Sequence, residues 1–297
     1  MQPIIGNFRS RYQIDTPIIF DPSKNRSTKT WAEDDFASVS KIRLSEGYEI
    51  KSFRELVDEV ANVTLNNTHY EMFYRGQAKD YKDKNNKTIV YPSICRPSKR
   101  EDGTTKSLIR SNEIIDRYDK LYKLINLYKG KTRHLDEWYI SLFQHYETCF
   151  TPLIDITQSL RVAATMALRN TTKGYLFVFG LPYPHGSISH FIDQKIVLVK
   201  LQNVSPVNAY RPRYQEGYLV GKYPIRETKE GGDNLAKRLV AKFLLNNEEN
   251  KFWDDSFTKM PETILFPEDD QIISKLEDVK SKYYDNNELK NIGNLNP

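Results

Sequence analysis

The sequence predicts an α+β fold in which a mixed or antiparallel central β-sheet is flanked by helices. Segments with helical periodicity and short β-rich runs follow one another in an irregular order, not as repeated βαβ units. Hydrophobic residues make up 39% of the 297 residues and charged residues 28%, a balance typical of a chain that buries a core. We therefore expect helices and strands to pack around a common core.

The N-terminal part is expected to contain an irregular arm followed by a helix. Residues 1–45 mix Pro, Ser, Lys and Asp with short apolar patches, of which residues 16–20 are a candidate strand. Ser52 and Glu55 form a capping-box pattern, in which the two side chains cover backbone N–H groups at the start of a helix. An amphipathic helix is therefore predicted to begin after Ser52.

The next part of the chain is expected to hold one strand and two helices. The apolar run 72–74 predicts a strand that ends in a ligand-facing turn at Arg75-Gly76. Apolar residues recur at steps of three and four over 107–128, which predicts the longest helix, with Gly130 as its C-terminal stop. A second helix is predicted over 135–146.

Most of the elements predicted between residues 152 and 223 are strands. A strand at 152–157 leads into an alanine-rich helix at 162–168, which is expected to be capped by Thr157 or Ser159. Three further β-rich runs predict strands: 174–179, 195–201 and 216–223.

The C-terminal part is expected to contain two helices around one strand. Asp233 is a candidate cap for a helix over 235–244, and residues 263–266 read as a last strand. Residues 267–270 then open a last helix with an acidic first turn.

Composition and spacing exclude several classes of protein. No apolar run approaches the roughly 20 residues of a membrane-spanning helix, and the N-terminus MQPIIGNFRSRYQ lacks the apolar core of a signal peptide, so we expect no membrane partner and a cytoplasmic location. The two cysteines and five histidines have no metal-ligand spacing, so no metal is expected. The net charge of +5 suits a polyanionic ligand or partner, although a solvated surface explains most of the lysines more simply.

Two short segments could bind a ligand. Arg75-Gly76-Gln77 places an arginine at a predicted strand end, beside a glycine that permits close backbone approach, which suits fork-like binding of a phosphate. A surface salt bridge is the alternative for Arg75. His145, between Gln144 and Tyr146 at a predicted helix end, could act as an acid, a base or a stacking platform, or be purely structural.

Two later segments also concentrate polar groups. Asp155 lies inside an apolar strand two residues before Thr157, and could pair with Arg75, cap the alanine-rich helix or take part in catalysis. Residues 211–217 combine two arginines, Gln215, Glu216 and a glycine, a density that suits ribose and phosphate oxygens. A charged loop with Gly217 as a bulge is the alternative.

In this order the segments resemble the FRG domain family, named for a phenylalanine-arginine-glycine motif. Five segments over residues 50–280 carry the resemblance: Phe73-Tyr74-Arg75-Gly76-Gln77; Tyr91-Pro92-Ser93-Ile94-Cys95-Arg96; Gln144-His145-Tyr146 with residues 151–157; Arg211 with Gln215 and Gly217; and Leu265-Phe266-Pro267. The chain departs from the family pattern at Ile156, where Trp is usual, and at Glu147, where Gly is usual.

The order of strands and polar residues is also similar to that of ADP-ribosyltransferase folds. This second resemblance implies an ADP-ribosyltransferase-like core in which Arg75, Gln77, Asp155 and Arg211 bind NAD. It further implies that Thr157 shapes the nicotinamide pocket and that His145 or Tyr146 stacks on a ring of the cofactor.

For catalysis, the resemblance implies that Glu216 holds a ribose hydroxyl, stabilises the transition state and orients the nucleophile, while Gln215 helps to position the substrate. The amide of Gln215 could not act as a base.

The leading hypothesis is therefore an NAD-dependent ADP-ribosyltransferase, acting as a toxin or phage-defence effector on nucleic acid, with RNA favoured, or on protein. A neutralising antitoxin is a possible partner. The alternatives are an NAD glycohydrolase and a nucleotide-binding or nucleic-acid-binding module without turnover. The expected organisation is an arm at 1–45, an FRG-type domain at 46–285 and a tail at 286–297.

Overall fold

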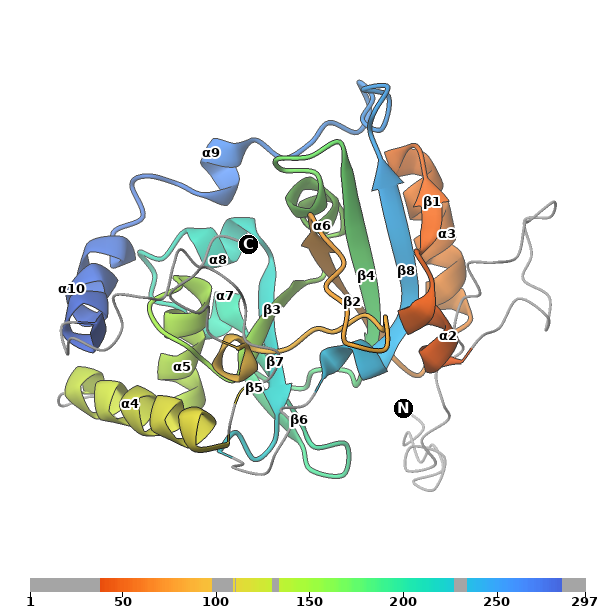
Figure 1. The fold of residues 1–297 in the computed structure, drawn as a ribbon. Helices are drawn as coiled ribbons and strands as arrows, with labels where there is room; N and C mark the ends of the chain where they lie inside the picture. The colour runs from red at the N-terminus through yellow and green to blue at the C-terminus, as the bar shows by residue number, and fades with distance from the viewer. Residues whose placement is uncertain (1–37, 98–108, 110, 130–133, 227–233, 285–297) are drawn as a thin grey trace, which may run out of the picture.

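The computed structural model describes residues 38–97, 109, 111–129, 134–226 and 234–284, and one eight-stranded sheet forms its centre (Figure 1). The strands are β1 (Tyr48–Ile50), β2 (Glu71–Gln77), β3 (Leu153–Thr157), β4 (Lys173–Leu181), β5 (Ile188–Phe191), β6 (Ile196–Lys200), β7 (Gly217–Lys222) and β8 (Leu239–Asn246). Their order across the sheet is β1-β8-β4-β2-β3-β7-β6-β5. β1 pairs with β8 in parallel and the other neighbours are antiparallel, which confirms the predicted α+β class with a mixed sheet.

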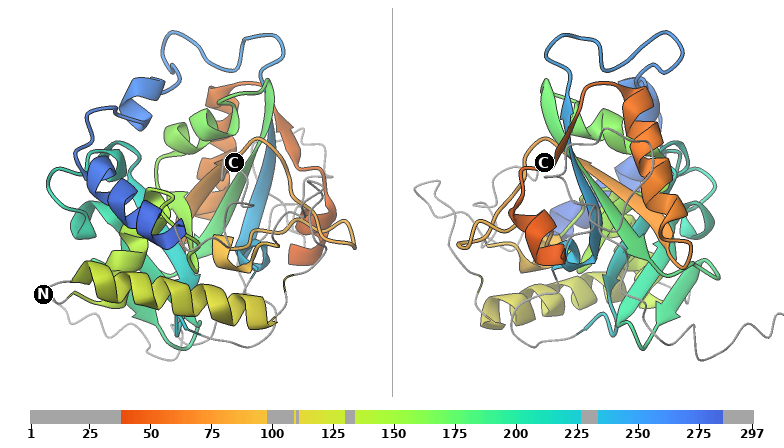
Figure 2. Two further views of the ribbon diagram at one scale, coloured as in Figure 1. Left: turned by 60° about the vertical axis from the view of Figure 1, so that its left-hand side comes forward. Right: turned by 90° about the vertical axis from the view of Figure 1, so that its right-hand side faces the viewer.

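The helices gather in two groups beside the sheet. Their bounds are Val39–Leu44 (α2), Phe53–Leu65 (α3), Ser111–Lys129 (α4), Asp136–His145 (α5), Leu160–Ala167 (α6), Leu201–Val204 (α7), Arg211–Tyr214 (α8), Glu262–Leu265 (α9) and Ile272–Tyr284 (α10), with 3₁₀ turns at Ser93–Cys95 (η2) and Leu235–Arg238 (η3). α4, α5 and α10 lie together near β3, β6 and β7, whereas α3 and α6 lie beside β2, β4 and β8 (Figure 1). The right-hand view of Figure 2 shows α3 and α2 on opposite sides of the strands.

Alternation along the strands sends side chains into different cores. On β3, Leu153 joins a core with α4, α5 and α10, while Ile154 and Ile156 point to the opposite face, toward α2 and η3. Since successive side chains of a strand point to opposite faces, Asp155 lies on the same face as Leu153, toward α5. This alternation places the one carboxylate of β3 beside the C-terminal end of α5.

The predicted start of α3 is confirmed with one variation. The Ser52 hydroxyl accepts a hydrogen bond from the backbone N–H of Glu55 at 3.1 Å. The Glu55 carboxylate accepts from the backbone N–H of Lys51 at 2.9 Å, one residue before the N-cap. Both side chains therefore satisfy backbone donors at the helix start, as a capping box does.

The predicted helix over 235–244 is wrong: η3 is followed by β8, one of the interior strands of the sheet. The run Leu239–Asn246 is buried on both faces of the sheet, so it shows no polar face and no period of two. A largely apolar run of this length, interrupted here by Lys242, fits a buried strand or a buried helix equally well. The pairing with β1 and β4 decided between them.

Three other expectations differ from the structure. Residues 263–266 were expected as a strand, but Glu262–Leu265 forms the short helix α9. Part of the expected arm is helical, since α2 buries Ile42 against the sheet. β1 and β5 were not predicted; each is too short to show an alternation. The candidate strand at 16–20, the stop at Gly130, the cap at Asp233 and the tail lie outside the described residues.

The ligand-facing turn expected at Arg75-Gly76 is also corrected, because β2 continues to Gln77 and pairs with β4 along its whole length. Gly76 faces α6: a Cβ placed there would lie 1.8 Å from the backbone oxygen of Ala163. The glycine is therefore explained by the close packing of α6 on the sheet, and not by the approach of a ligand.

Replacing Gly76 with alanine should destabilise the fold, because α6 would have to move away from β2. We expect a loss of about 1–3 kcal/mol or more in the free energy of unfolding, measured by urea denaturation. Gly186→Ala is the matched control, because its nearest neighbour would be 3.7 Å away, and its effect should stay within about 0.5 kcal/mol. Equal stability of the two variants would contradict this account of Gly76.

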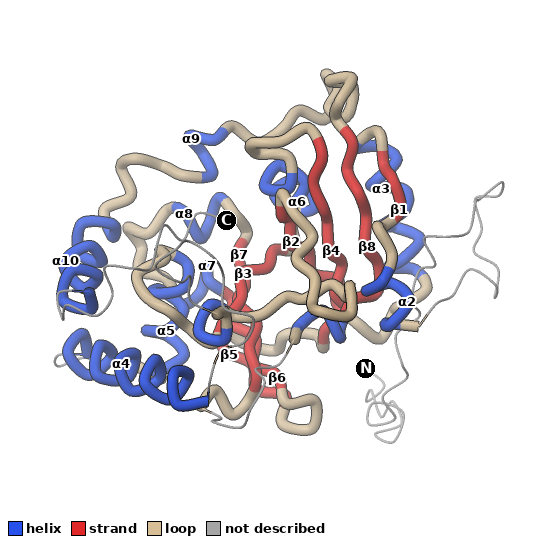
Figure 3. The backbone as a smooth tube through the Cα atoms, viewed as in Figure 1, coloured by secondary structure: helices blue, strands red, loops and turns tan. Residues whose placement is uncertain are grey.

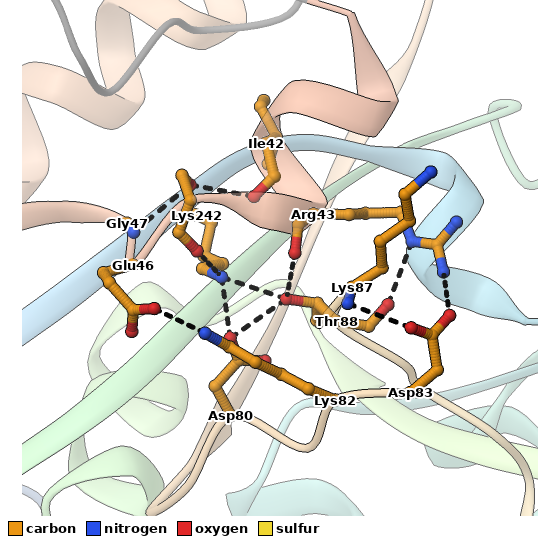
Figure 4. Close-up of polar contacts among 11 residues, drawn as sticks. Ile42, Arg43, Glu46, Gly47, Asp80, Lys82, Asp83, Lys87, Thr88 and Lys242 are labelled. Atoms are coloured by element: carbon orange, nitrogen blue, oxygen red, sulfur yellow. Dashed lines mark hydrogen bonds and ion pairs between the residues drawn. The ribbon is translucent and has the colours of Figure 1, made fainter. Parts of the chain in front are cut away.

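A buried ion pair fastens the segment after β2 to β8 (Figure 4). Lys242 on β8 is 0% exposed, and its ammonium group donates to the Asp80 carboxylate at 2.7 Å, to the Thr88 hydroxyl at 2.9 Å and to the Ser45 carbonyl. Burial lowers the pKa of Lys242, and the carboxylate of Asp80 opposes that shift. The contacts of Lys242 thus join β8 to Ser45, which precedes β2 in the chain, and to Asp80 and Thr88, which follow it.

Candidate functional site

The sheet is nearly split between β2 and β3. These neighbours pair at a single position, Tyr74 with Thr157, whereas β3 pairs with β7 from Leu153 to Thr157. The strands on either side of this position form two groups (Figure 3). The side chain of Arg75 bridges the split, where its Nη1 donates to the backbone oxygen of Asp155 at 2.6 Å.

The carboxylate of Asp155 is held at both oxygens. Its Oδ1 lies 3.0 Å from Nδ1 of His145, and its Oδ2 accepts from Nε2 of Gln144 at 2.7 Å. The sequence left open whether Asp155 pairs with Arg75 or caps α6. It does neither, since Arg75 contacts only its backbone oxygen and the carboxylate faces α5.

The protonation states of this pair follow from burial and hydrogen bonding. Burial raises the pKa of Asp155, but the hydrogen bonds from His145 and Gln144 and the charge of Arg75 outweigh it, so the pKa lies below its usual value. Burial lowers the pKa of His145, which is 2% exposed. An ionised Asp155 beside a neutral His145 places the ring proton on Nδ1 and leaves a lone pair on Nε2.

That lone pair has no partner. Nε2 of His145 is buried and has no hydrogen bond in the described structure. A buried polar atom without a partner costs about 1–3 kcal/mol. Stacking on a ligand ring, the role expected for His145, requires an exposed ring face, whereas the His145 ring is 2% exposed. A hydrogen bond to Nε2 does not require an exposed ring face.

Two arginines lie close together at the split. Burial, together with the positive charge of Arg96, lowers the pKa of Arg75 to about 10, against the opposing charges of Asp155 and Glu147. Nε of Arg75 is buried without a partner, while Nε of Arg96 donates to the Tyr91 carbonyl at 3.0 Å. Unlike most arginines, Arg75 forms no ion pair within 4 Å with a described carboxylate, so the salt-bridge alternative is not realised there.

Arg211 lies beside the cluster that Arg75, His145 and Asp155 form. Its guanidinium is 4.8 Å from the ring centroid of Phe266 and 5.9 Å from that of Tyr146, and its Nη2 is 3.6 Å from the Glu147 carboxylate. The buried carboxylate of Asp270 fixes this region: it accepts from the Tyr146 hydroxyl at 2.7 Å and from the backbone N–H of Arg211 at 3.0 Å. Nε of Arg211 is buried without a partner.

Two predicted site residues already use their polar atoms inside the protein. The Thr157 hydroxyl donates to the carbonyl oxygens of Gln215 at 2.8 Å and Glu216 at 3.1 Å, and accepts from the backbone N–H of Ser159. The Gln215 amide donates to the Leu265 carbonyl at 2.7 Å and is 8% exposed. Both side chains therefore hold the turn before β7, and Thr157 does not cap α6 directly.

Glu216 stands apart from this cluster. Its side chain is exposed and has no hydrogen bond or ion pair among the described residues. Its φ of 46° lies in the left-handed region, which a residue with a Cβ adopts at a cost. It does not contribute to the pKa shifts of Arg75, His145 or Asp155. Glu216 is therefore a free carboxylate on a strained turn beside the cluster.

The structure thus joins Arg75, His145, Asp155 and Arg211, with Glu216 at the margin. Gln77 lies two residues beyond Arg75 on β2, with its Oε1 buried and unpartnered. Sequence reasoning did not select Gln144, Glu147 or Arg96 as site residues. Gln144 and Arg96 could have been selected, because both lie in segments that carry the resemblance to the FRG domain family.

Comparison of the chain with protein-family models, curated proteins and solved structures found no match. Within the described ranges, no three His, Cys, Asp or Glu side chains are grouped to hold a metal ion. No helix of the described part is long and apolar enough to cross a membrane. The roles of the clustered residues therefore rest on their geometry and on the resemblance carried by their motifs.

Proposed function

We propose that the chain is an NAD-dependent ADP-ribosyltransferase that binds NAD at the split between β2 and β3. The observation that carries the proposal is Arg75, a guanidinium in the split with a buried, unpartnered Nε and a second arginine, Arg96, beside it. Guanidinium groups bind phosphate oxygens through paired N–H donors. A pyrophosphate between the two arginines would offset their mutual repulsion.

The transfer replaces one bond at C1′ of the nicotinamide ribose by another. The bond from C1′ to the nicotinamide nitrogen breaks, its electron pair leaves with neutral nicotinamide, and a nucleophile bonds to C1′. The free carboxylate of Glu216 would hold a ribose hydroxyl and stabilise the oxocarbenium-like transition state. Tyr146, held by Asp270, would offer its ring beside Arg211 to a base of the cofactor.

The resemblance to FRG domains and to ADP-ribosyltransferase folds supports the same reaction. The net charge of +5 favours nucleic acid, and RNA in particular, as the acceptor, with protein as the other class. We propose a cytoplasmic toxin or phage-defence effector, which a neutralising antitoxin would hold inactive.

A binding module without turnover is the second candidate. It is favoured by the placement of Gln215 and Thr157, whose polar atoms are already used, and of Glu216, which lies outside the charge cluster. An NAD glycohydrolase, with water as the acceptor, would share the site of the leading proposal.

Labelled NAD distinguishes these functions. The full chain is incubated with NAD labelled in the adenylate and in the nicotinamide, together with cellular RNA, DNA and protein, and label transfer and nicotinamide release are followed. Transfer supports the leading proposal, and release alone supports hydrolysis. NAD binding without release or transfer would leave only the binding module. The absence of NAD binding would overturn both enzymatic functions and leave a module that binds another nucleotide or nucleic acid.

Arg75→Ala should weaken NAD binding about tenfold or more, because hydrogen bonds to charged groups contribute about 1.5–3 kcal/mol each. Isothermal titration calorimetry measures the effect. Arg226→Ala is the matched control, since Arg226 forms an exposed ion pair with Asp119 at 2.7 Å away from the cluster. Unchanged NAD affinity of Arg75→Ala would remove Arg75 from the binding site.

A further inference from the structure

His145 carries a ring nitrogen that the roles assigned above do not use. The ring is 2% exposed, its Nδ1 lies 3.0 Å from Oδ1 of Asp155, and its Nε2 is buried without a partner. One nitrogen is therefore fixed by the protein, and the other is left to accept a hydrogen bond from outside the described residues.

Asp155 is held by two further contacts besides that with His145. Its Oδ2 accepts from the Gln144 amide at 2.7 Å, and its backbone oxygen accepts from Arg75 at 2.6 Å. The oxygen of the Gln144 amide in turn accepts from the Thr151 hydroxyl, which fixes the amide so that its NH₂ group faces Asp155. The carboxylate cannot turn away, so the orientation of the imidazole is fixed as well.

The Cε1 edge of the ring faces the start of β7. A Cβ placed on Gly217 would lie 3.6 Å from Cε1 of His145, the carbon between the two ring nitrogens, and Gly217 directly follows Glu216. The charged groups around the ring are Asp155 on β3, Arg211 on α8 and Glu147 after α5. The free lone pair thus lies beside the turn that carries the proposed catalytic carboxylate.

We infer that His145 is the general base of the proposed transfer, with Nε2 as the proton acceptor and Asp155 as its positioning residue. The inference rests on the proposed function. As a hydroxyl of the acceptor attacks C1′ of the nicotinamide ribose, its proton moves to Nε2 and nicotinamide leaves with the electron pair of the broken bond. The imidazolium is stabilised by Asp155 and then returns its proton to solvent.

The chain contains a matched control for this pair. His190 also meets a carboxylate, with its Nε2 3.0 Å from Oε1 of Glu137, but this pair is made through the opposite ring nitrogen and does not belong to the cluster. Glu137→Gln and His190→Gln therefore change a similar pair without touching the proposed base.

The first arm measures the ring tautomers of the ligand-free protein by long-range ¹H–¹⁵N spectroscopy at neutral pH. We expect His145 to be neutral with its proton on Nδ1, and Asp155→Asn to move that proton to Nε2. Glu137→Gln should leave the His145 signals unchanged. A wild-type ring that is protonated on Nε2 overturns the inference without any activity assay.

The second arm measures label transfer and nicotinamide release with NAD and RNA. His145→Gln and Asp155→Asn should each lower kcat about 10²-fold or more, with KM for NAD changed only a few-fold. The wild-type rate should fall at low pH as His145 is protonated, and His145→Gln should lose this limb of the pH profile. The Glu137 and His190 variants should match the wild type.

Failure of the proposed function can be distinguished from failure of the inference about His145. A wild type that neither transfers nor releases overturns the proposed function, and the base role with it. An active wild type whose rate and acid limb persist in His145→Gln overturns only the inference about His145. Thermal unfolding identifies a variant that fails to fold, and if Asp155→Asn does so, the tautomer of the wild type and the pH profile of His145→Gln decide.

Discussion

Glu216→Gly is expected to stabilise the protein while it slows the proposed ADP-ribosyl transfer about 10²-fold or more. At φ 46° the backbone is left-handed, which costs a residue with a Cβ about 1–2 kcal/mol. Glycine avoids this cost but loses more conformational freedom on folding, so we expect a net gain of about 0.5–1 kcal/mol in the free energy of unfolding. A carboxylate kept on a strained turn without an internal partner is the pattern of a functional residue.

Loss of this carboxylate should lower kcat for transfer about 10²–10³-fold, the range seen when one electrostatic stabiliser of a transition state is removed. Glu216→Gln separates the two effects, because it keeps the strain and removes only the charge. Lys195, at φ 54°, is the control: Lys195→Gly should gain similar stability with unchanged transfer. Transfer at the wild-type rate by Glu216→Gly would exclude Glu216 from catalysis.

Lys242→Met should be the most destabilising single change considered for this protein. It removes the ammonium group and leaves the Asp80 carboxylate, 2% exposed, buried without its positive partner. Breaking a buried pair from one side costs about 3–5 kcal/mol. Urea denaturation measures the loss. The segment after β2 contains Thr88 and leads to Arg96, so weaker NAD binding should accompany the loss.

The exposed pair of Lys251 with Glu249 is the control for this prediction. Its N–O distance of 2.9 Å is similar, but both side chains are 77% exposed, so Lys251→Met should leave the free energy of unfolding close to that of the wild type. The double variant Lys242→Met with Asp80→Asn should recover part of the loss, because no uncompensated charge remains. Equal effects of Lys242→Met and Lys251→Met would contradict the role given to burial.

The sequence alone predicted the elements whose signals are local. The Ser52 and Glu55 cap, the periodicity of α4 and α5, the apolar run of β3 after a proline and the alanine-rich stretch of α6 depend on neighbours a few positions apart. β8 was not predicted. It lies between β1 and β4 and is buried on both faces of the sheet, so its sequence shows no period of two. Its identity depends on partners nearly 200 residues away, such as Glu49 beside Leu244.

For the site, the sequence determined which chemical groups are available: the guanidiniums of Arg75 and Arg211, the carboxylates of Asp155 and Glu216, and the imidazole of His145. Only the tertiary structure decided which atoms remain free. Arg75 and Asp155 are 80 residues apart and meet because β2 and β3 pair at one position and then diverge. That divergence leaves the Asp155 carbonyl to a side chain. The alternation of side chains along β3 directs the carboxylate toward His145, because strand geometry fixes the direction of both groups.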